Sequence, residues 1–442
     1  MYVESLEIKN FRGIDHSQIT FQKGFNIIKG ENGKGKTSII EALAVALGGF
    51  IAGFSGVSTR HFAKEDIRKE IKLIGDGSCT ETYKTPIEVS VSAVIHGRKE
   101  IWTRSRASLK SSRTTTTPKA IIKLAEEMEL DENSELPVIV LQSASRVWNQ
   151  KKEKTQNVFK TKYSRTTGYM DALEDASNIK LLLNWCVKME QVSWQKGKAI
   201  AEYEAVKKAV ADFMSYINGK NNYQVFYDKQ LEELVYSVDG CVKTVNSLSA
   251  GYQSLIWMVF DIAYRMAVLN PENKLQIAEG QGIVLIDEID MHLHPKWQWN
   301  IVDALRKVFP NIQFIATTHA PILFASAKNV WLIDVEQDEP KYSYSHYGID
   351  INTAVKSFQD TSEVPLSIKK RIDKFYDAMD AGKYEEAREI LLAVESETEP
   401  AFASVVQMRT RYEFETMISN DEKPEYLGIV NWYINKQIKR RK

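Results

Sequence analysis

The stretch KGENGKGKTSII (residues 29–40) joins a glycine-rich turn to the start of an apolar run. Three glycines leave room for the backbone to approach another group closely. Lys34 and Lys36 add positive charge, and Thr37 supplies a hydroxyl. The run that follows predicts a buried helix from Thr37 to about Leu47. Because a helix N-terminus binds anions, we expect an anion site here.

Residues 30–37 fit the pattern G-x-x-x-x-G-K-[ST] and lie between a predicted strand, FNIIK, and this helix. That setting is the one a phosphate-binding loop requires. Lys36 is expected to bridge the β- and γ-phosphates, and Thr37 to bind Mg²⁺. The alternative is a glycine-rich turn with a solvated lysine. The expected nucleotide-binding residues are Asn32, Gly33, Lys34, Gly35, Lys36, Thr37 and Ser38, with ATP and Mg²⁺ as cofactors.

The composition narrows the class of protein. A chain of 442 residues is too long for one compact core, so two or three structural units are expected. Basic and acidic residues number 58 each, which gives no whole-chain argument for nucleic acid. Three distant cysteines favour a reducing compartment. The N-terminus has no signal-peptide pattern and the longest apolar stretch is too short for a membrane span, so we expect a cytoplasmic protein without membrane contact.

The segment GIVLIDEID (282–290) places a wholly apolar run before two acids. Such a run is typical of a strand buried on both faces, as in a parallel sheet. Ligands of these sheets bind at the carboxyl ends of the strands. Asp287 is therefore expected to hold Mg²⁺, and Glu288 to act as the base that polarises the attacking water. The alternative is that the acids only cap the next helix.

A second buried strand is predicted in NIQFIATTHAP (311–321), and His319 lies at its end. We expect His319 to bond a phosphate oxygen as a catalytic sensor, although a lone histidine is more often structural. His292 and His294 are two residues apart in a loop with one nearby acid. That spacing is poor for zinc, so no metal is expected there.

Other elements follow from periodicity and turn residues. Strands are predicted at 2–11, within 16–30, in a hairpin at 86–104 that turns at His96-Gly97, at 136–142, on both sides of Asp239-Gly240, and at 330–336. Helices are predicted at 171–216, 252–269 and 296–309, and through the tail, where 361–400 is expected to form a helical hairpin. That hairpin either packs on the rest of the chain or binds a partner. The Ser/Thr-rich basic stretch 105–117 is expected to be a mobile loop. With the tail KQIKRRK it is a candidate contact for nucleic acid.

Together with SLSAGYQS (247–254), these motifs resemble the ABC-type ATPase heads of the SMC, RecF and Rad50 group. LSAGY resembles the signature LSGGQ, with Ala250 where the family has a glycine. LEIKNFRGI resembles the first strand and its arginine-containing loop. Gln142 in VIVLQSASR matches the Q-loop glutamine, which senses Mg²⁺ and the γ-phosphate.

The resemblance implies an α/β fold: a P-loop ATPase head with a mixed, mainly parallel sheet core, an antiparallel β subdomain, a helical insert and a helical C-terminal extension. The expected boundaries are 1–149 and 231–348 for the two parts of the head, 150–230 for the insert and 349–442 for the extension. It also implies a homodimer around two ATP molecules, in which the phosphate loop of one subunit faces Ser249 and Gly251 of the other. In isolation, these two residues would suggest an ordinary turn before a helix.

A narrower resemblance, carried by LNPEN, GIVLIDEIDMHLHPKWQ and FPNIQFIATTHAPI, is to stand-alone bacterial ATPases such as the PtuA-type ATPases of Septu and retron anti-phage systems. It implies a sensor or regulator partnered by a PtuB-like HNH nuclease, with a retron reverse transcriptase and its non-coding RNA as further candidates. Residues 350–442 contain no D-x-D of a nuclease domain. A RecF-like DNA-repair clamp and a scaffold that barely hydrolyses ATP remain the alternatives.

Overall fold

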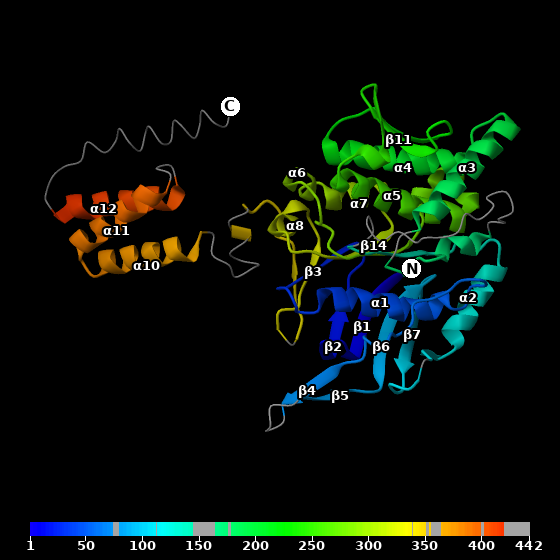
Figure 1. The fold of residues 1–442 in the computed structure, drawn as a ribbon, viewed down its shortest axis with the longest axis horizontal. Coiled ribbons are helices and arrows are strands. Elements are labelled where there is room, and N and C mark those ends of the chain that lie inside the picture. Colours follow the sequence, from blue (N-terminus) through cyan, green and yellow to red (C-terminus); the bar gives the residue numbers. More distant parts are fainter. Residues whose placement is uncertain are drawn as a thin grey trace. The chain divides into compact units, whose positions relative to one another are not determined.

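The computed structural model describes residues 1–73, 79–111, 113–144, 164–175, 178–337, 339–350, 353–354, 364–398 and 402–419. Its internal contacts divide the chain into two compact units, Met1–Ala354 and Val355–Lys442 (Figure 1). Each unit is described by itself.

The first unit is built around a six-stranded sheet in the order β16-β15-β3-β14-β13-β9. Every neighbouring pair is parallel except β15 and β16. Each residue of β3, β9, β13 and β14 is buried, as the unbroken apolar runs predict for strands covered on both faces. The strands are β3 (Phe25–Lys29), β9 (Val138–Gln142), β13 (Gly282–Ile286), β14 (Ile312–Thr317), β15 (Trp331–Asp334) and β16 (Lys341–Tyr344).

A second sheet is antiparallel, with five strands in the order β2-β1-β6-β7-β8. The predicted hairpin is confirmed, and its turn residues His96 and Gly97 both have positive φ, 47° and 79°. The strands are β1 (Tyr2–Phe11), β2 (Ile14–Thr20), β6 (Ile87–Ile95), β7 (Arg98–Arg106) and β8 (Thr115–Thr117).

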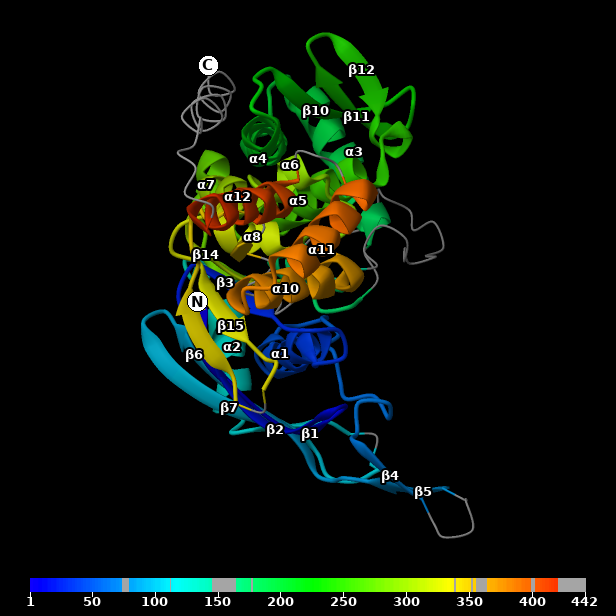
Figure 2. The ribbon, with the colours of Figure 1, turned by 90° about the vertical axis from the view of Figure 1, so that its left-hand side faces the viewer.

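Helix α1 (Lys36–Ile51) packs against strands of both sheets, and all but three of its residues are buried (Figure 2). The indole Nε1 of Trp102 on β7 donates to the carbonyl oxygen of Ala46 at 2.7 Å. A Cβ at Gly49 would lie 2.8 Å from that nitrogen, so only glycine permits this approach. Helix α2 (Ala120–Leu130) also packs on α1.

The expectation of a mobile loop over 105–117 is wrong at both ends of that stretch. Residues 115–117 form β8, which pairs with β7. Arg106 is buried and donates to the carbonyl oxygens of Phe62 and Leu109, each at 3.1 Å. Threonine favours strands, and the edge of β7 offers unpaired backbone groups, so the polar stretch completes the sheet. Arg106 is therefore not available for nucleic acid.

The region predicted as one helical stretch, 171–216, forms two helices that break at Gly197, where φ is 60°. They are α3 (Ile179–Lys196) and α4 (Ala201–Asn218). On α3 the indole of Trp194 is 79% exposed. Helix α4 packs on α5 (Ala250–Leu269), so it belongs to the first unit.

A three-stranded antiparallel sheet, β10-β11-β12, follows these helices and lies over them (Figure 2). Its turn at Asp239-Gly240 is confirmed, whereas β10 was not predicted. The strands are β10 (Tyr223–Asp228), β11 (Glu233–Val238) and β12 (Cys241–Thr244).

Shorter elements complete the first unit. The helix expected at 296–309 is two helices, α6 (Pro295–Gln298) and α7 (Ile301–Val308). An unpredicted two-stranded hairpin, β4 (Lys69–Leu73) and β5 (Cys79–Tyr83), projects from the body (Figure 2). The remaining helices are η1 (Arg165–Tyr169), η2 (Val245–Ser247), η3 (Pro271–Glu279) and α8 (Pro321–Ser326).

The described residues of the second unit form three helices, α10 (Leu366–Asp380), α11 (Tyr384–Glu397) and α12 (Ala403–Ser419). The predicted helical hairpin is confirmed, with Gly382 at a φ of 70° between α10 and α11. The helices share an apolar core that includes Phe375, Leu391 and Met408. The tail KQIKRRK (436–442) lies outside the described residues. Among the described residues, no helix is both long and apolar enough to cross a membrane.

Candidate nucleotide-binding site

Three neighbouring strands deliver the predicted site residues to one edge of the central sheet. Because β3, β14 and β13 run parallel, their carboxyl ends meet at the same edge. The phosphate loop follows β3, Asp287 and Glu288 follow β13, and His319 follows β14. Residues almost 290 positions apart in the chain therefore lie together.

The phosphate loop, Gly30–Thr37, needs its glycines for their backbone angles. Gly33 and Gly35 have φ of 84° and 86°, in the left-handed region that favours glycine. Gly35 is the N-cap of α1, so the loop passes directly into the buried helix. The backbone N–H groups at this end have no partners further back in the helix, and the helix dipole adds positive potential. Asn32, Gly33 and Lys34 are exposed, and Ser38 is half-buried.

Lys36 lies inside the loop. Its side chain is 6% exposed, and Nζ donates to the carbonyl oxygens of Gly30 at 2.7 Å and Glu31 at 2.8 Å. Burial lowers the pKa of the Lys36 ammonium, while nearby carboxylates, Asp287 first among them, act in the opposite direction. The ammonium is thus held where a phosphate lying on the loop would reach it.

Oxygen ligands gather around Asp287. Its Oδ1 accepts hydrogen bonds from the hydroxyls of Thr37 at 3.2 Å and Thr317 at 2.7 Å. The Asp287 amide donates to the carbonyl oxygen of Gln142 at 2.9 Å, which ties β13 to β9 at this edge. A carboxylate beside a hydroxyl of the phosphate loop is the hard-oxygen set that Mg²⁺ prefers. These residues therefore fit the predicted metal.

Glu288 has a backbone conformation that is unusual for a residue other than glycine, with φ at 51°. Its N–H donates to Thr317 Oγ1 at 2.8 Å. The one hydroxyl of Thr317 therefore fixes Asp287 through its proton and Glu288 through its lone pair. Thr317 was not among the predicted site residues. The signal was its place beside His319 in TTH, at the end of a buried strand.

Gln142 contributes to the edge mainly through its backbone. Its side-chain Nε2 donates to Asp261 Oδ2 at 2.7 Å, and Asp261 in turn pairs with Arg265, whose Nε lies 3.0 Å away. The carboxamide is thus anchored to α5. A role for Gln142 as a metal ligand or sensor stays a prediction. To take that role, the side chain would have to use its other carboxamide atom, Oε1, or break its hydrogen bond to Asp261.

The signature turn lies at the start of α5. Ser249 is the N-cap residue, but its exposed hydroxyl does not cap the helix. A Cβ at Gly251 would lie 2.5 Å from the carbonyl oxygen of His292, so glycine is needed for this packing. Within the described part of the chain, no hydrogen bond joins this turn to the phosphate loop. His294, two residues after His292, accepts a hydrogen bond from the amide of Lys296 and caps α6.

Two family models match this chain. The model described as "AAA domain" matches residues 5–218, and the one described as "AAA domain, putative AbiEii toxin, Type IV TA system" matches residues 264–325. Together they include the phosphate loop, both acids and His319. The probable ATPase of retron Vc95 from Vibrio cholerae serotype O1 biovar El Tor is 26% identical over an alignment of 401 positions that covers 78% of this chain and 76% of that protein.

The Septu protein PtuA of Bacillus mycoides (strain KBAB4) is also 26% identical, over 73% of this chain but only 38% of PtuA. The chain is an AAA-domain ATPase related to retron ATPases and PtuA. Among solved structures, the SMC head bound to the C-winged helix domain of ScpA matches with a TM-score of 0.46 and 18% identity, over 80% of this chain and all of that one.

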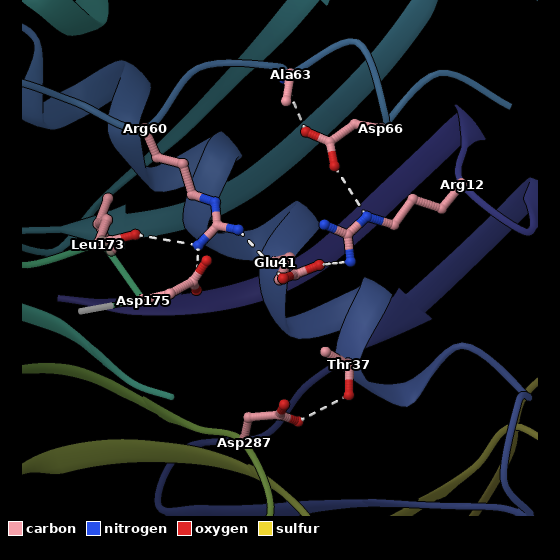
Figure 3. A network of polar contacts seen from close by, with 9 residues as sticks. All are labelled: Arg12, Thr37, Glu41, Arg60, Ala63, Asp66, Leu173, Asp175 and Asp287. Carbon is pink, nitrogen blue, oxygen red and sulfur yellow. Dashed lines mark hydrogen bonds and ion pairs between the residues drawn. The ribbon is translucent and has the colours of Figure 1, made fainter. Parts of the chain in front are cut away.

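An ion-pair network extends from the phosphate-loop helix of this ATPase (Figure 3). Glu41, one turn after Thr37, pairs with Arg12 from the β1–β2 turn and with Arg60, 3.2 Å away. Arg12 also binds Asp66 at 2.9 Å, and Arg60 binds Asp175 at 2.7 Å. The sequence indicates only the arginine-containing loop, because the partners of its arginine come from distant segments.

Two cavities lie near this edge of the sheet. One of about 320 Å³ is lined by Glu41, Asp175 and Asp287. The other, of about 600 Å³, lies beside Gly33–Gly35 and is also lined by residues 13–17 and Glu336. Its volume falls within the range of about 300–1,000 Å³ that small-molecule sites occupy. A nucleotide whose phosphates lie on the loop would have space on this side for the rest of the molecule.

Proposed function

We propose that the chain is a Mg²⁺-dependent, ABC-type ATPase that dimerises around ATP and regulates an anti-phage complex with a nuclease effector. The observation that carries the hydrolytic part is the meeting of Lys36, Thr37 and Asp287 at one sheet edge, with Thr37 Oγ1 3.2 Å from Asp287 Oδ1. This arrangement supplies a cation for the phosphates and oxygen ligands for the metal. Glu288, held by Thr317, is the base that orients water, and His319 senses the γ-phosphate.

The proposed dimer rests on the signature turn. Ser249 presents an exposed hydroxyl that does not cap its own helix. A second copy related by a two-fold axis would bring this hydroxyl and the amides at the start of α5 to the γ-phosphate of its partner's ATP. Two ATP molecules would then lie between the two heads, and hydrolysis would release them. Ala250, in place of the usual glycine, is expected to slow this closure.

The test compares wild type with Glu288→Gln and Lys36→Ala. With Mg²⁺ and ATP, Glu288→Gln should retain ATP and elute as a dimer on size-exclusion chromatography with light scattering, while turnover falls at least about a hundredfold. Lys36→Ala should bind no ATP and remain in the nucleotide-free state. Normal turnover in Glu288→Gln would contradict the role given to this residue. A monomeric, ATP-bound Glu288→Gln would contradict the dimer alone.

The defence role is supported by the relationship to a retron ATPase and to PtuA. We include in this proposal a nuclease partner, a candidate reverse transcriptase with its RNA, and a cytoplasmic location. The three cysteines are free thiols, which agrees with that location.

We would express the chain with its neighbouring genes and identify what copurifies by mass spectrometry. A stoichiometric nuclease would support the proposal. A bare homodimer with DNA-stimulated hydrolysis would favour a repair clamp, and tight ATP binding with almost no turnover would favour a scaffold.

A further inference from the structure

A pocket of about 300 Å³ lies between the β10–β12 sheet and the start of α5. Three tyrosines (Tyr223, Tyr236 and Tyr252) and three lysines (Lys220, Lys243 and Lys296) are among its lining residues. We call it the tyrosine–lysine pocket. It shares no lining residue with either cavity near the nucleotide-site edge of the central sheet, so it is a separate site of the subunit.

The charge of this pocket is positive. Lys220 lies 3.5 Å from Asp239, but no ion pair within the described residues involves Lys243 or Lys296. The three lysines are exposed and come from three different segments, the end of α4, β12 and α6. Converging ammonium groups with a single carboxylate attract an anion, and lysine is a common phosphate binder.

The walls of the pocket are aromatic. The ring centroids of Tyr223 and Tyr236 are 5.6 Å apart, and those of Tyr236 and Tyr252 are 6.0 Å apart. Tyr252 in turn packs edge-on against Trp297, with a centroid distance of 4.6 Å. Burial raises the pKa of both Tyr223 and Tyr236, so their phenols remain neutral at physiological pH. Neutral phenols donate hydrogen bonds. Tyr223 and Tyr236 are 7% and 4% exposed and form the floor of the pocket, while the half-buried Tyr252 offers ring surface to a planar base.

We propose that the tyrosine–lysine pocket binds a nucleotide unit, with its phosphate at the lysines and its base against the tyrosines. The volume admits one such unit, which is either a free mononucleotide or the end of a single strand. Leu248 and Tyr252 line the pocket and flank Ser249 and Gly251. An occupant therefore contacts the residues on either side of the signature turn and can change how that turn is presented.

The test uses Cys241, an exposed thiol that lines the pocket. Cys79→Ser removes the other exposed cysteine, and Cys186 is buried. The rate of maleimide labelling of Cys241 is measured in buffer that contains neither Mg²⁺ nor ATP. The rate without ligand is compared with the rates in the presence of AMP and of a 5′-phosphorylated oligo(dT) of ten nucleotides. At ten times its dissociation constant, a ligand should slow labelling about tenfold. Slowing by AMP indicates a free nucleotide, and slowing by the oligonucleotide alone indicates a strand end.

Matched charge reversals provide the control. Lys243→Glu with Lys296→Glu should abolish the protection. Lys229→Glu, at an exposed lysine of the β10–β11 turn that does not line the pocket, should leave it unchanged. Protection should also survive Lys36→Ala, which separates this site from the phosphate loop. If neither probe slows the labelling of Cys241, or if Lys229→Glu weakens protection as much as the pocket variants, the proposal is wrong.

Discussion

At the scale of single residues, one hydroxyl organises the acids of the site. Thr317 is 1% exposed and bonds both Asp287 Oδ1, at 2.7 Å, and the amide of Glu288, at 2.8 Å. The positive φ of Glu288 is an unfavourable conformation for this residue type, and the bond to Thr317 helps to hold it. The orientation of Glu288, the proposed base, therefore depends on Thr317, which does not itself take part in the proposed reaction.

We predict that Thr317→Val lowers kcat for ATP about tenfold to a hundredfold and changes KM for ATP little. The substitution keeps the volume but removes both hydrogen bonds, each worth about 0.5–1.5 kcal/mol, and it leaves the half-buried amide of Glu288 without this partner. Steady-state ATPase assays measure the effect. Thr317→Ser, which retains the hydroxyl, should recover most of the activity. Equal loss in both variants would mean that packing at this position matters, and not the hydroxyl.

At the scale of elements, helix α1 is the part that links the phosphate loop to the rest of the head. It lies between the two large sheets, and its C-terminal end rests on α2. Gly53, just after the helix, permits this contact, because a Cβ there would lie 2.3 Å from the carbonyl oxygen of Ile122. The close approach fixes the axis of α1, and with it the direction of the amides at its N-terminus.

Gly53→Ala should destabilise the first unit by about 1–3 kcal/mol, since the added methyl group forces α1 and α2 apart. Urea unfolding, followed by tryptophan fluorescence, measures the change. The control is Gly13→Ala, where a Cβ meets nothing within 4 Å, and we expect a change within about 0.5 kcal/mol. Equal midpoints for the two variants would contradict this account of α1.

At the scale of the whole molecule, the chain consists of two units with separate apolar cores. The first contains every residue of the proposed nucleotide site. The second, whose described helices are α10, α11 and α12, has a small core around Phe375, which is fully buried. A separate core predicts that the second unit can unfold without loss of the site.

Phe375→Ala should remove about 3–5 kcal/mol of stability from the second unit, because it leaves a cavity in a core that is small. Hydrogen exchange measured by mass spectrometry should become faster in α10–α12 and stay unchanged in β13 and β14. Leu392→Ala, at a side chain that is 54% exposed, is the matched control and should have little effect. Faster exchange in both units after Phe375→Ala would show that their stabilities are coupled.

The sequence by itself determined the phosphate loop, the buried parallel strands and the acids at their ends. Each of these features is encoded by residues that are close together in the sequence: a glycine-rich turn before an apolar helix, or an apolar run before Asp287-Glu288. Parallel strands place their carboxyl ends at one edge whatever their order in the sheet, so His319 could be assigned to the same edge without knowledge of the fold.

Only the tertiary structure decided which distant side chains meet. The Arg12–Glu41–Arg60 ion pairs, the double role of Thr317 and the anchoring of Gln142 on Asp261 join segments whose separation in the chain carries no periodic signal. Edge strands such as β8 were also not predicted. A short polar strand forms because a neighbouring strand offers unpaired backbone groups, and its own residues carry little signal for a strand. The tyrosine–lysine pocket arises in the same way, from three segments that only the folded chain brings together.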